Sequence, residues 1–399
     1  MAEYSRKDTK IFLALVLLSL FSLSLLSVPF VQGVTVSTVG TMAGTRGWLF
    51  SQSAPLGIYY GFGYGDNWCG GTARCSDLYY FDFATESNSL IKSDTSTPLV
   101  WGDSLYSTII GDKIFIADFY NPFDPSKGAS VDANGLYAID TKTNSFYLYD
   151  RLPFDFFVDY WPSPMAAVGT DLYFFVGIPG RPDIASRVYK YDPATKTTTT
   201  LAELPKELGS GGIVYAAGSN IYITTYNWGS ENSLYVYDTL KDGFTYLATS
   251  PLIPSNNYRS NSVINGKLYF VGGEEPVYDT ALNTIVEYDP STNQFSVIDS
   301  LSYGLLGAST TSLSGSLYVV GGEVHSEPGI TDSIIKIEIL NPISEIEKSC
   351  PANGSYKNHG KYVSCVSKKA EEFFNSGLIT EQQKNEIVSK AAKSNIGKK

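Results

Sequence analysis

The sequence predicts an all-β fold, a six-bladed β-propeller, for most of its 399 residues. The first indication is composition: 29 Tyr, 36 Gly and only 17% charged residues are typical of a β-rich protein with many tight turns. The second is a repeat of roughly fifty residues, clearest where the strand Leu268–Gly273 is followed by a second strand ending at Asp289. Such a unit cannot bury its apolar face alone, so neighbouring units must stack.

Two markers give the number of units. The apolar residue that opens the second strand of each unit recurs at Ile58, Ile114, Leu172, Ile221, Leu268 and Leu317. The acidic residue near the end of each third strand recurs at Asp82, Asp140, Asp192, Asp238, Asp289 and Glu338. Because both markers recur once per unit, we expect six four-stranded antiparallel blades.

The N-terminal region, residues 1–33, reads as a targeting segment. Ile11–Val28 is an uncharged run of apolar residues and serines, and Arg6, Lys7 and Lys10 precede it. Its length fits both a cleaved signal peptide and an N-terminal membrane anchor, so both alternatives stay open. Either one predicts an exported protein whose propeller lies outside the membrane, because the basic flank stays inside.

The propeller is expected over residues 34–342. Its sixth unit has a third strand at Ile334–Leu340, but Asn341 and Pro342 end that strand and no fourth strand follows. The run Val34–Val39 has the β-branched character of the missing strand. We therefore expect this N-terminal strand to complete the last blade and close the ring.

The repeat resembles the kelch family of β-propellers. The resemblance extends from about Val34 to Leu340 and is carried by Gly272-Gly273, Gly321-Gly322, Asp192–Thr195 and Asp289–Asn293. The fourth-strand Trp of that family is replaced here by Phe146, Phe244 and Phe295. The resemblance implies the fold, but it does not imply one function, because kelch propellers serve both as enzymes and as binding platforms.

The C-terminal residues 343–399 predict a small helical hairpin. One helix is expected over Val363–Asn375, and a capping box at Thr380 opens a second. The expected buried seam consists of Phe373, Phe374, Ile379, Ile387, Val388 and Ala391. The string Asn358–Val366 resembles a short Cys-containing helical module of exported microbial proteins, a likeness that implies no mechanism. His359 in this string is expected in a turn.

Four cysteines fall into two local pairs, Cys69 with Cys75 and Cys350 with Cys365. An even number of clustered cysteines in an exported chain favours two disulfides. A metal site is the weaker reading, because only two His are present and neither lies at a zinc-binding spacing from a cysteine pair. The sequence therefore predicts no metal and no cofactor.

The two faces of the predicted propeller differ. One carries minimal turns such as Gly111-Asp112 and Asn265-Gly266, whereas the other carries long connections such as Gly61–Asp77 and Asp118–Gly135. Long loops carry function more often than short turns do. The ligand-binding candidates on the long-connection face are Trp68, Arg74, Trp101, Trp161, Arg181, Trp228, Tyr258, Arg259, Glu274, Glu323 and His325. In the alternative reading, several of these aromatic residues only pack between blades.

Composition and motifs narrow the function classes. The net charge is -11, the C-terminal segment from Glu345 is net basic, and the rest of the chain is net acidic without a basic stripe, so nucleic-acid binding is not expected. Asp124, Asp132 and Asn134 do not have EF-hand spacing for calcium. The sequence favours a monomeric, non-enzymatic scaffold at the cell surface that binds an extracellular saccharide or protein. The alternatives are a carbohydrate-active enzyme using carboxylates such as Glu274 and Glu323, and a structural surface protein.

Overall fold

The computed structural model describes residues 34–45, 49–62, 77–92, 106–117, 135–153, 164–177, 186–208, 212–225, 230–254, 260–275, 280–324, 329–340, 342–375, 379 and 381–398. The chain divides into two compact units. One is Val34–Ile339, which is built of strands, and the other includes Leu340–Lys399, which is helical.

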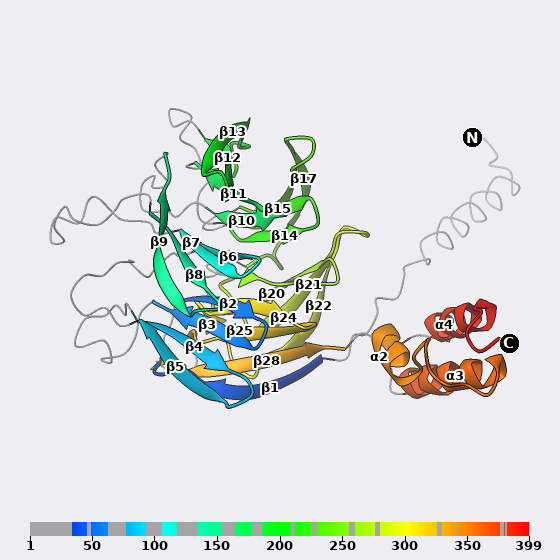
Figure 1. Cartoon of the computed structure of the whole chain (residues 1–399). Coiled ribbons are helices and arrows are strands. Elements are labelled where there is room, and N and C mark those ends of the chain that lie inside the picture. Colours follow the sequence, from blue (N-terminus) through cyan, green and yellow to red (C-terminus); the bar gives the residue numbers. More distant parts are fainter. Residues whose placement is uncertain are drawn as a thin grey trace, which may run out of the picture. The chain divides into compact units, whose positions relative to one another are not determined.

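Six blades, each with four antiparallel strands, make up most of the strand unit (Figure 1). Blade 1 contains β2 (Phe50–Ala54), β3 (Gly57–Gly61), β4 (Leu78–Asp82) and β5 (Ser87–Lys92). Blade 2 contains β6 (Tyr106–Ile110), β7 (Lys113–Ala117), β8 (Gly135–Asp140) and β9 (Ser145–Arg151). Blade 3 contains β10 (Met165–Val168), β11 (Asp171–Val176), β12 (Arg187–Asp192) and β13 (Thr197–Glu203).

The second half of the ring repeats this arrangement. Blade 4 contains β14 (Val214–Ala217), β15 (Asn220–Thr224), β16 (Asn232–Asp238) and β17 (Gly243–Ser250). Blade 5 contains β19 (Val263–Ile264), β20 (Lys267–Val271), β21 (Thr284–Asp289) and β22 (Gln294–Ser300). Blade 6 contains β24 (Ser309–Leu313), β25 (Ser316–Val320), β28 (Ser333–Ile339) and β1 (Val34–Thr41). The six-bladed propeller predicted from the repeat is confirmed.

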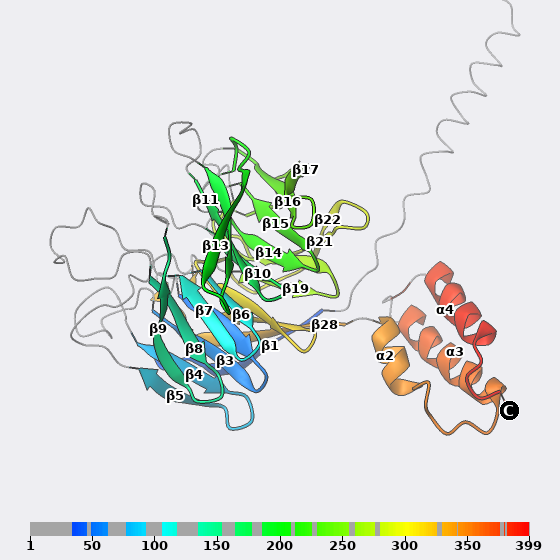
Figure 2. The same ribbon diagram turned by 45° about the horizontal axis from the view of Figure 1, so that its top comes forward.

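The N-terminal strand closes the ring, as predicted. β1 pairs antiparallel with β28, with Val34 opposite Ile339 and Ser37 opposite Lys336. Figures 1 and 2 show β1 beside β28, although the two strands come from opposite ends of the propeller sequence. The last blade is thus completed by the strand that precedes the first blade.

The hydrophobic core consists of six clusters, and each cluster joins two adjacent blades. Phe115 of blade 2 and Phe174 of blade 3 share one cluster, for example, and Phe81 of blade 1 and Tyr318 of blade 6 share another. The six residues that mark the second strands are all fully buried: Ile58, Ile114, Leu172, Ile221, Leu268 and Leu317. Radial stacking therefore buries the apolar faces that a single blade would leave in water.

The acidic residue at the end of the third strand stabilises the turn that follows it. In blade 3, Asp192 Oδ1 accepts a hydrogen bond from the backbone N–H of Ala194 at 2.8 Å. Asp192 Oδ2 accepts one from the hydroxyl of Thr195 at 2.8 Å, and Lys196 ends the turn at φ 57°. Equivalent turns follow Asp82, Asp140, Asp238 and Asp289. At a tight turn the backbone N–H groups have no partner on a neighbouring strand, and the aspartate oxygen accepts their hydrogen bonds instead.

Four short strands were not predicted. β18 (Ser260–Asn261) pairs parallel with β24, so the chain touches blade 6 before it enters blade 5. β23 (Leu305–Leu306), β26 (Glu323–Val324) and β27 (Gly329–Ile330) form a separate three-stranded sheet. These strands are too short to produce a periodic hydrophobic pattern.

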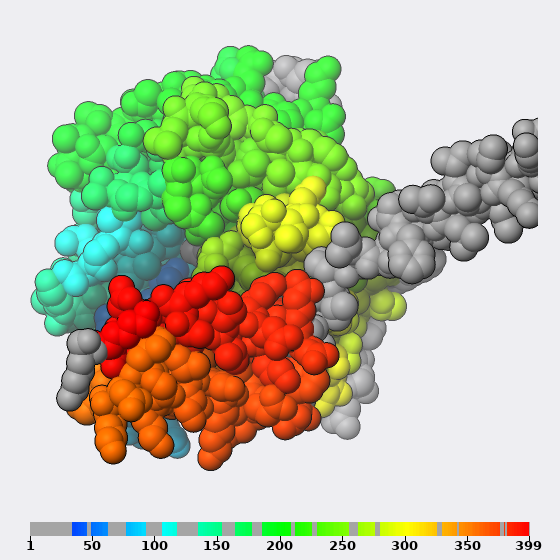
Figure 3. Space-filling view, turned by 90° about the vertical axis from the view of Figure 1, so that its right-hand side faces the viewer, coloured from blue at the N-terminus to red at the C-terminus, as the bar shows by residue number. Residues whose placement is uncertain are grey.

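The helical unit contains three described helices, α2 (Pro342–Ser349), α3 (His359–Asn375) and α4 (Glu381–Lys393). Figure 3 shows this unit from outside, with α4 in red beside α3 in orange. All six residues of the predicted seam belong to its apolar cluster. The helix α2 is additional to the expected two-helix hairpin. Pro342 ends the preceding strand and also starts this helix, because proline fits the first turn of a helix. His359 was expected in a turn, and this expectation is wrong: His359 is the first residue of α3.

Candidate binding site

Most candidates named from sequence lie outside the described residues. These are Trp68, Arg74, Trp101, Trp161, Arg181, Trp228, Tyr258, Arg259 and His325. The same holds for Cys69 and Cys75, and for the aspartates and asparagine weighed for calcium, Asp124, Asp132 and Asn134. Glu274 and Glu323 lie in the described part of the chain, so the long-connection face can be described around them, at blades 5 and 6.

Two double glycines shape this face. Gly272-Gly273 follows β20 and Gly321-Gly322 follows β25, and all four residues have positive φ. A Cβ on Gly272 would lie 2.6 Å from the carbonyl oxygen of Leu305, and one on Gly322 would lie 2.8 Å from Leu305 Cδ1. Glycine is therefore required at these positions for two reasons: the backbone has a positive φ, and Leu305 lies too close for a side chain.

The short strand β23 connects the two glycine pairs. The backbone N–H of Gly273 donates to the carbonyl of Leu305 at 2.8 Å, while Leu306 is paired with Glu323 in β26. Glu274 is paired with Ala281, so each double glycine leads into a hairpin. We call the surface formed by residues 272–275, 280–282, Leu305–Leu306, 321–324 and 329–331 the glycine platform. Backbone hydrogen bonds hold its described residues, for example from Leu282 N–H to the Gly273 carbonyl and from Thr331 N–H to the Gly322 carbonyl.

The two carboxylates differ in exposure. Glu274 and Glu323 follow the double glycines at equivalent places in blades 5 and 6, but Glu274 is only 8% exposed whereas Glu323 is exposed. Glu323 is therefore the one of the two that can contact a macromolecular partner. Glu274 and Glu323 are far apart in the sequence, but the structure places each of them beside β23.

A second concave site lies at the other end of the propeller axis. A cavity of about 590 Å³ is lined by inner-strand and turn residues of blades 1, 2, 4, 5 and 6. Its lining residues are Gln52, Ser53, Ile109, Ala216, Ala217, Gly218, Tyr222, Val263, Gly266, Thr311 and Ser312. Because Gly218 and Gly266 belong to two-residue hairpin turns, this end of the axis is the short-turn face. We call this cavity the axial cavity.

Hydrogen bonds between blades 1 and 6 hold the wall of the axial cavity. Ser51 Oγ donates to Ser309 Oγ at 2.8 Å. Thr311 Oγ1 accepts from the backbone N–H of Ser53 at 3.0 Å, and Ser53 Oγ donates to the carbonyl of Ser312 at 2.7 Å. These are the two blades that adjoin at the ring closure. Small hydroxyl side chains let the inner strands approach closely while satisfying buried polar groups.

The lining of the axial cavity carries no formal charge. Burial raises the pKa of the Tyr222 hydroxyl, so that group stays neutral at physiological pH. Lys267, on the neighbouring strand β20, is paired with Glu287 at 2.6 Å. Burial by itself lowers the pKa of Lys267, but the contacts with Glu287 and Asp289 together outweigh it and the net shift is upward. The charge of Lys267 is thus neutralised by carboxylates of blade 5.

Sequence reasoning missed the axial cavity. Its residues are small, lie in short strands and come from blades far apart in the chain, so no local motif marks them. The available signal was the run of small hydroxyl residues in the first strands of blades 1 and 6, which include Ser51, Ser53, Ser309 and Thr311. Such side chains are unusual where a strand is buried on both faces.

The helical unit is cross-linked and has its own depressions. Cys350 and Cys365 form the predicted disulfide between the end of α2 and the middle of α3. The two ring nitrogens of His359 lie 2.7 Å from the carbonyl oxygen of Ile396 and 3.0 Å from that of Ala392. His359 thus connects the start of α3 with the end of the α4 segment, a structural role.

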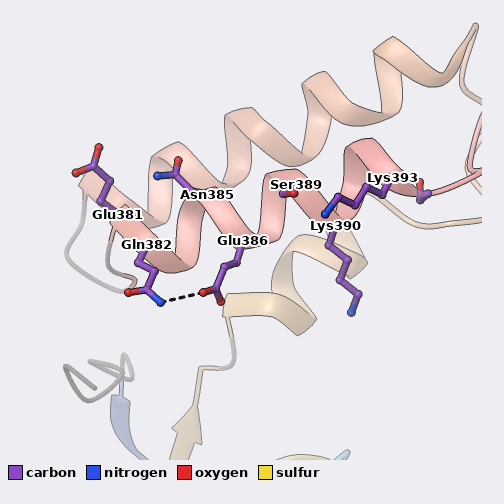
Figure 4. A pocket seen from close by; sticks show the side chains of 8 residues that line it. Glu381, Gln382, Asn385, Glu386, Ser389, Lys390 and Lys393 are labelled. Atoms are coloured by element: carbon purple, nitrogen blue, oxygen red, sulfur yellow. Dashed lines mark hydrogen bonds between the residues drawn. The ribbon is translucent and has the colours of Figure 1, made fainter. Parts of the chain in front are cut away.

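One depression of the helical unit follows α4. Figure 4 shows Glu381, Asn385 and Lys393 projecting from this helix, and Gln382 donating to Glu386 at 3.0 Å. Its lining comes from residues 381–394 alone, so it is an open polar helix face. A second depression of about 570 Å³ lies among the three helices and includes Ile346, Tyr362 and Ile387.

Two classes of feature are not found in the described part of the chain. No group of three or more His, Cys, Asp or Glu residues there is placed to hold a metal ion. No helix among the same residues is both long and apolar enough to cross a membrane. The apolar run Ile11–Val28 lies outside that part.

Comparisons with known proteins agree with the geometry. The family model described as Kelch motif matches residues 257–302, which include all four strands of blade 5. Kelch-like protein 25 of Xenopus tropicalis is 25% identical over 195 residues, which are 44% of this chain and 31% of that protein. Kelch-like protein 21 of Rattus norvegicus is 35% identical over 86 residues, or 21% and 14% of the two chains. The match thus spans less than a third of the length of these relatives.

A solved structure, that of YjhT, has the same fold. It superposes with a TM-score of 0.55 and 13% sequence identity, covering 76% of this chain and all of that one. Identity this low shows the fold alone. Together with the repeat, the double glycines and the blade topology, these matches show a kelch motif at residues 257–302 and a kelch-type propeller fold.

Proposed function

We propose that this protein is exported and works at the cell surface as a binding scaffold, with the long-connection face of its propeller as the contact surface. Kelch propellers typically serve as protein-binding scaffolds. Export is supported by the basic flank and apolar run of residues 1–33. The disulfide between Cys350 and Cys365 supports an oxidising compartment, because such bonds are rare in the cytosol.

The glycine platform is the observation that carries the choice of face. It presents an exposed carboxylate, Glu323, on a backbone held by hairpin pairing and by the contacts of Leu305. A preformed surface loses little conformational entropy when a partner binds. The opposite face consists of minimal turns and offers less adaptable surface for a macromolecule.

Photo-crosslinking tests the choice of face. A photoreactive amino acid replaces Glu323 on the long-connection face in one variant and Glu86 in another. Glu86 is a matched control, because it is an exposed glutamate in the short turn between the third and fourth strands of blade 1. Lys196 occupies the same place in blade 3 with a similar φ, so this turn position accepts different side chains. We expect a defined crosslinked partner on intact cells from position 323 only. Equal crosslinking from both positions, or crosslinking from position 86 alone, contradicts the proposal.

Protease treatment of intact cells tests export separately. We expect added protease to degrade the propeller while a cytoplasmic marker protein stays intact. A propeller that becomes sensitive only after lysis would refute the proposed location, whatever the crosslinking result.

A further inference from the structure

We propose that the axial cavity binds a small, uncharged polyhydroxy compound of the size of a mono- or disaccharide. This site lies on the short-turn face, away from the glycine platform, and it does not depend on the proposed scaffold function. The volume of about 590 Å³ falls within the range of roughly 300–1,000 Å³ that is usual for ligand pockets.

An unpartnered polar side chain marks the cavity as a binding site. Gln52 lines it, is only 5% exposed, and makes no side-chain hydrogen bond to another residue in the described part of the chain. Among the described residues, only the hydroxyls of Ser262 and Thr310 are fully buried without a hydrogen-bond partner, so the Gln52 amide is open to the cavity and can bond a water molecule or a ligand. Its two donors and one acceptor match the alternating donors and acceptors of vicinal hydroxyl groups.

The wall of the cavity is preorganised by contacts between blades. The hydrogen bonds of Ser51 and Ser53 to blade 6 fix one side. β18 pairs with β24 and contacts β14, so the segment that leads into blade 5 also connects the inner strands of blades 4 and 6. Farther along the axis, the Tyr106 hydroxyl of blade 2 donates to the carbonyl of Gly212 in blade 4 at 2.7 Å. A ligand can therefore be held without reorganising the blades.

The chemistry of the lining selects an uncharged ligand. Among the lining residues, all of which are described, there is no Asp, Glu, Lys, Arg or His. A charged compound would lose its hydration without gaining a counter-charge. Besides the Gln52 amide, Ser312 contributes a hydroxyl to the lining, while Ala216, Ala217 and Val263 contribute apolar surface that can contact the C–H groups of a sugar.

Ligand-observed NMR on the full chain tests the proposal with neutral probes glucose, galactose and trehalose and charged probes glucosamine and glucuronate. We expect at least one neutral probe to bind and both charged probes to bind more weakly. Gln52→Met removes the amide at similar size and should weaken binding about tenfold. Gln294→Met is the matched control, since Gln294 is exposed on the outer strand β22, and it should bind as the unmodified protein does.

A second variant guards against misfolding. Ala216→Leu places a larger apolar side chain at the cavity wall and should abolish binding, while the melting temperature reports whether each variant is folded. Three results would overturn the proposal: no neutral probe binds, charged probes bind equally well, or binding survives both folded variants. The last result would place any sugar site elsewhere on the protein.

Discussion

Single residues in this propeller are constrained by contacts that the sequence does not reveal. Gly272 and Gly218 have the same φ of 63°, but their surroundings differ. A Cβ on Gly272 meets the Leu305 carbonyl at 2.6 Å, whereas nothing lies within 4 Å of a Cβ on Gly218. The first glycine therefore serves packing as well as turn geometry, and the second serves turn geometry alone.

This difference predicts unequal effects of alanine. Gly218→Ala should destabilise the protein by about 1 to 3 kcal/mol, the cost of a non-glycine residue in a left-handed conformation. Gly272→Ala should cost that amount plus about 1 to 3 kcal/mol more, because the clash must displace β23. Chemical unfolding of both variants measures the difference. Equal losses would show that the contact with Leu305 yields easily.

The turn aspartates predict a pH dependence. The pKa of Asp192 lies below its usual value, first because Thr195 donates a hydrogen bond to it and then because the N–H of Ala194 does. A lowered folded-state pKa means that the charged form stabilises the fold above about pH 4, the usual unfolded value, and that this contribution is lost as pH falls through the folded value.

Asp192→Asn isolates this contribution, because asparagine retains the acceptor for the N–H of Ala194 but does not titrate. We expect the variant to melt below the unmodified protein at pH 7. The gap should shrink as pH falls and vanish in strong acid, where Asp192 is protonated. Melting curves between neutral and acidic pH measure it. A gap that is constant across this range would show that the carboxylate charge contributes nothing.

Among the elements, β1 has the largest consequence for the ring. It pairs with β28 along its length. It also contributes Val34 to the cluster between blades 5 and 6 and Val39 to the cluster between blades 6 and 1. One strand thus joins the last blade to both of its neighbours.

Removing β1 should therefore open the propeller. A protein that begins at Gly40 lacks most of this strand, whereas one that begins at Val34 retains it and is the control. Each large apolar side chain newly exposed along the β28 edge costs about 1.5 to 3 kcal/mol. We expect low soluble yield and early melting for the shorter protein only. Matching melting curves for the two proteins would show that the ring closes without β1.

The outer strands share a feature that limits edge pairing. In every blade, the pairing of the outermost strand contains a register shift, for example between Leu78 and Tyr79 in blade 1 and between Thr38 and Gly40 in blade 6. A bulge twists a strand and interrupts its row of free backbone groups. Assembly of the molecule through its blade edges is thereby disfavoured.

At the scale of the whole molecule, the chain combines two differently stabilised units. The propeller is held by six interblade clusters, whereas the helical unit has one small cluster and a disulfide that closes a loop across 15 residues. Such a loop contributes about 3 kcal/mol in the chain-entropy model. A unit of this size is near the lower limit for stable folding.

Reduction should therefore affect the helical unit selectively. We expect a reducing agent to lower the melting temperature of the helical signal in circular dichroism while the propeller transition stays in place. The Cys350→Ala, Cys365→Ala double variant should melt at that lower temperature with or without reductant. A helical signal that melts unchanged after reduction would show that the apolar cluster around Ile346 and Ala370 suffices.

The sequence by itself determined the blades, their number and the closing strand. Hydrophobic spacing is a local property, and the residues it marked, such as Ile58 and Leu317, are fully buried in the structure. The seam of the helical unit was determined in the same way, because Phe373, Ile387 and their neighbours follow a helical period.

Only the tertiary structure decided the glycine platform and the axial cavity. Both arise where short segments from different blades meet: Leu305 fills the space above two double glycines, and Gln52 faces residues from four other blades. A local pattern records which side of a strand is buried, but it does not record which distant residue lies opposite. That information appears only when six stacked blades bring their inner strands around one axis.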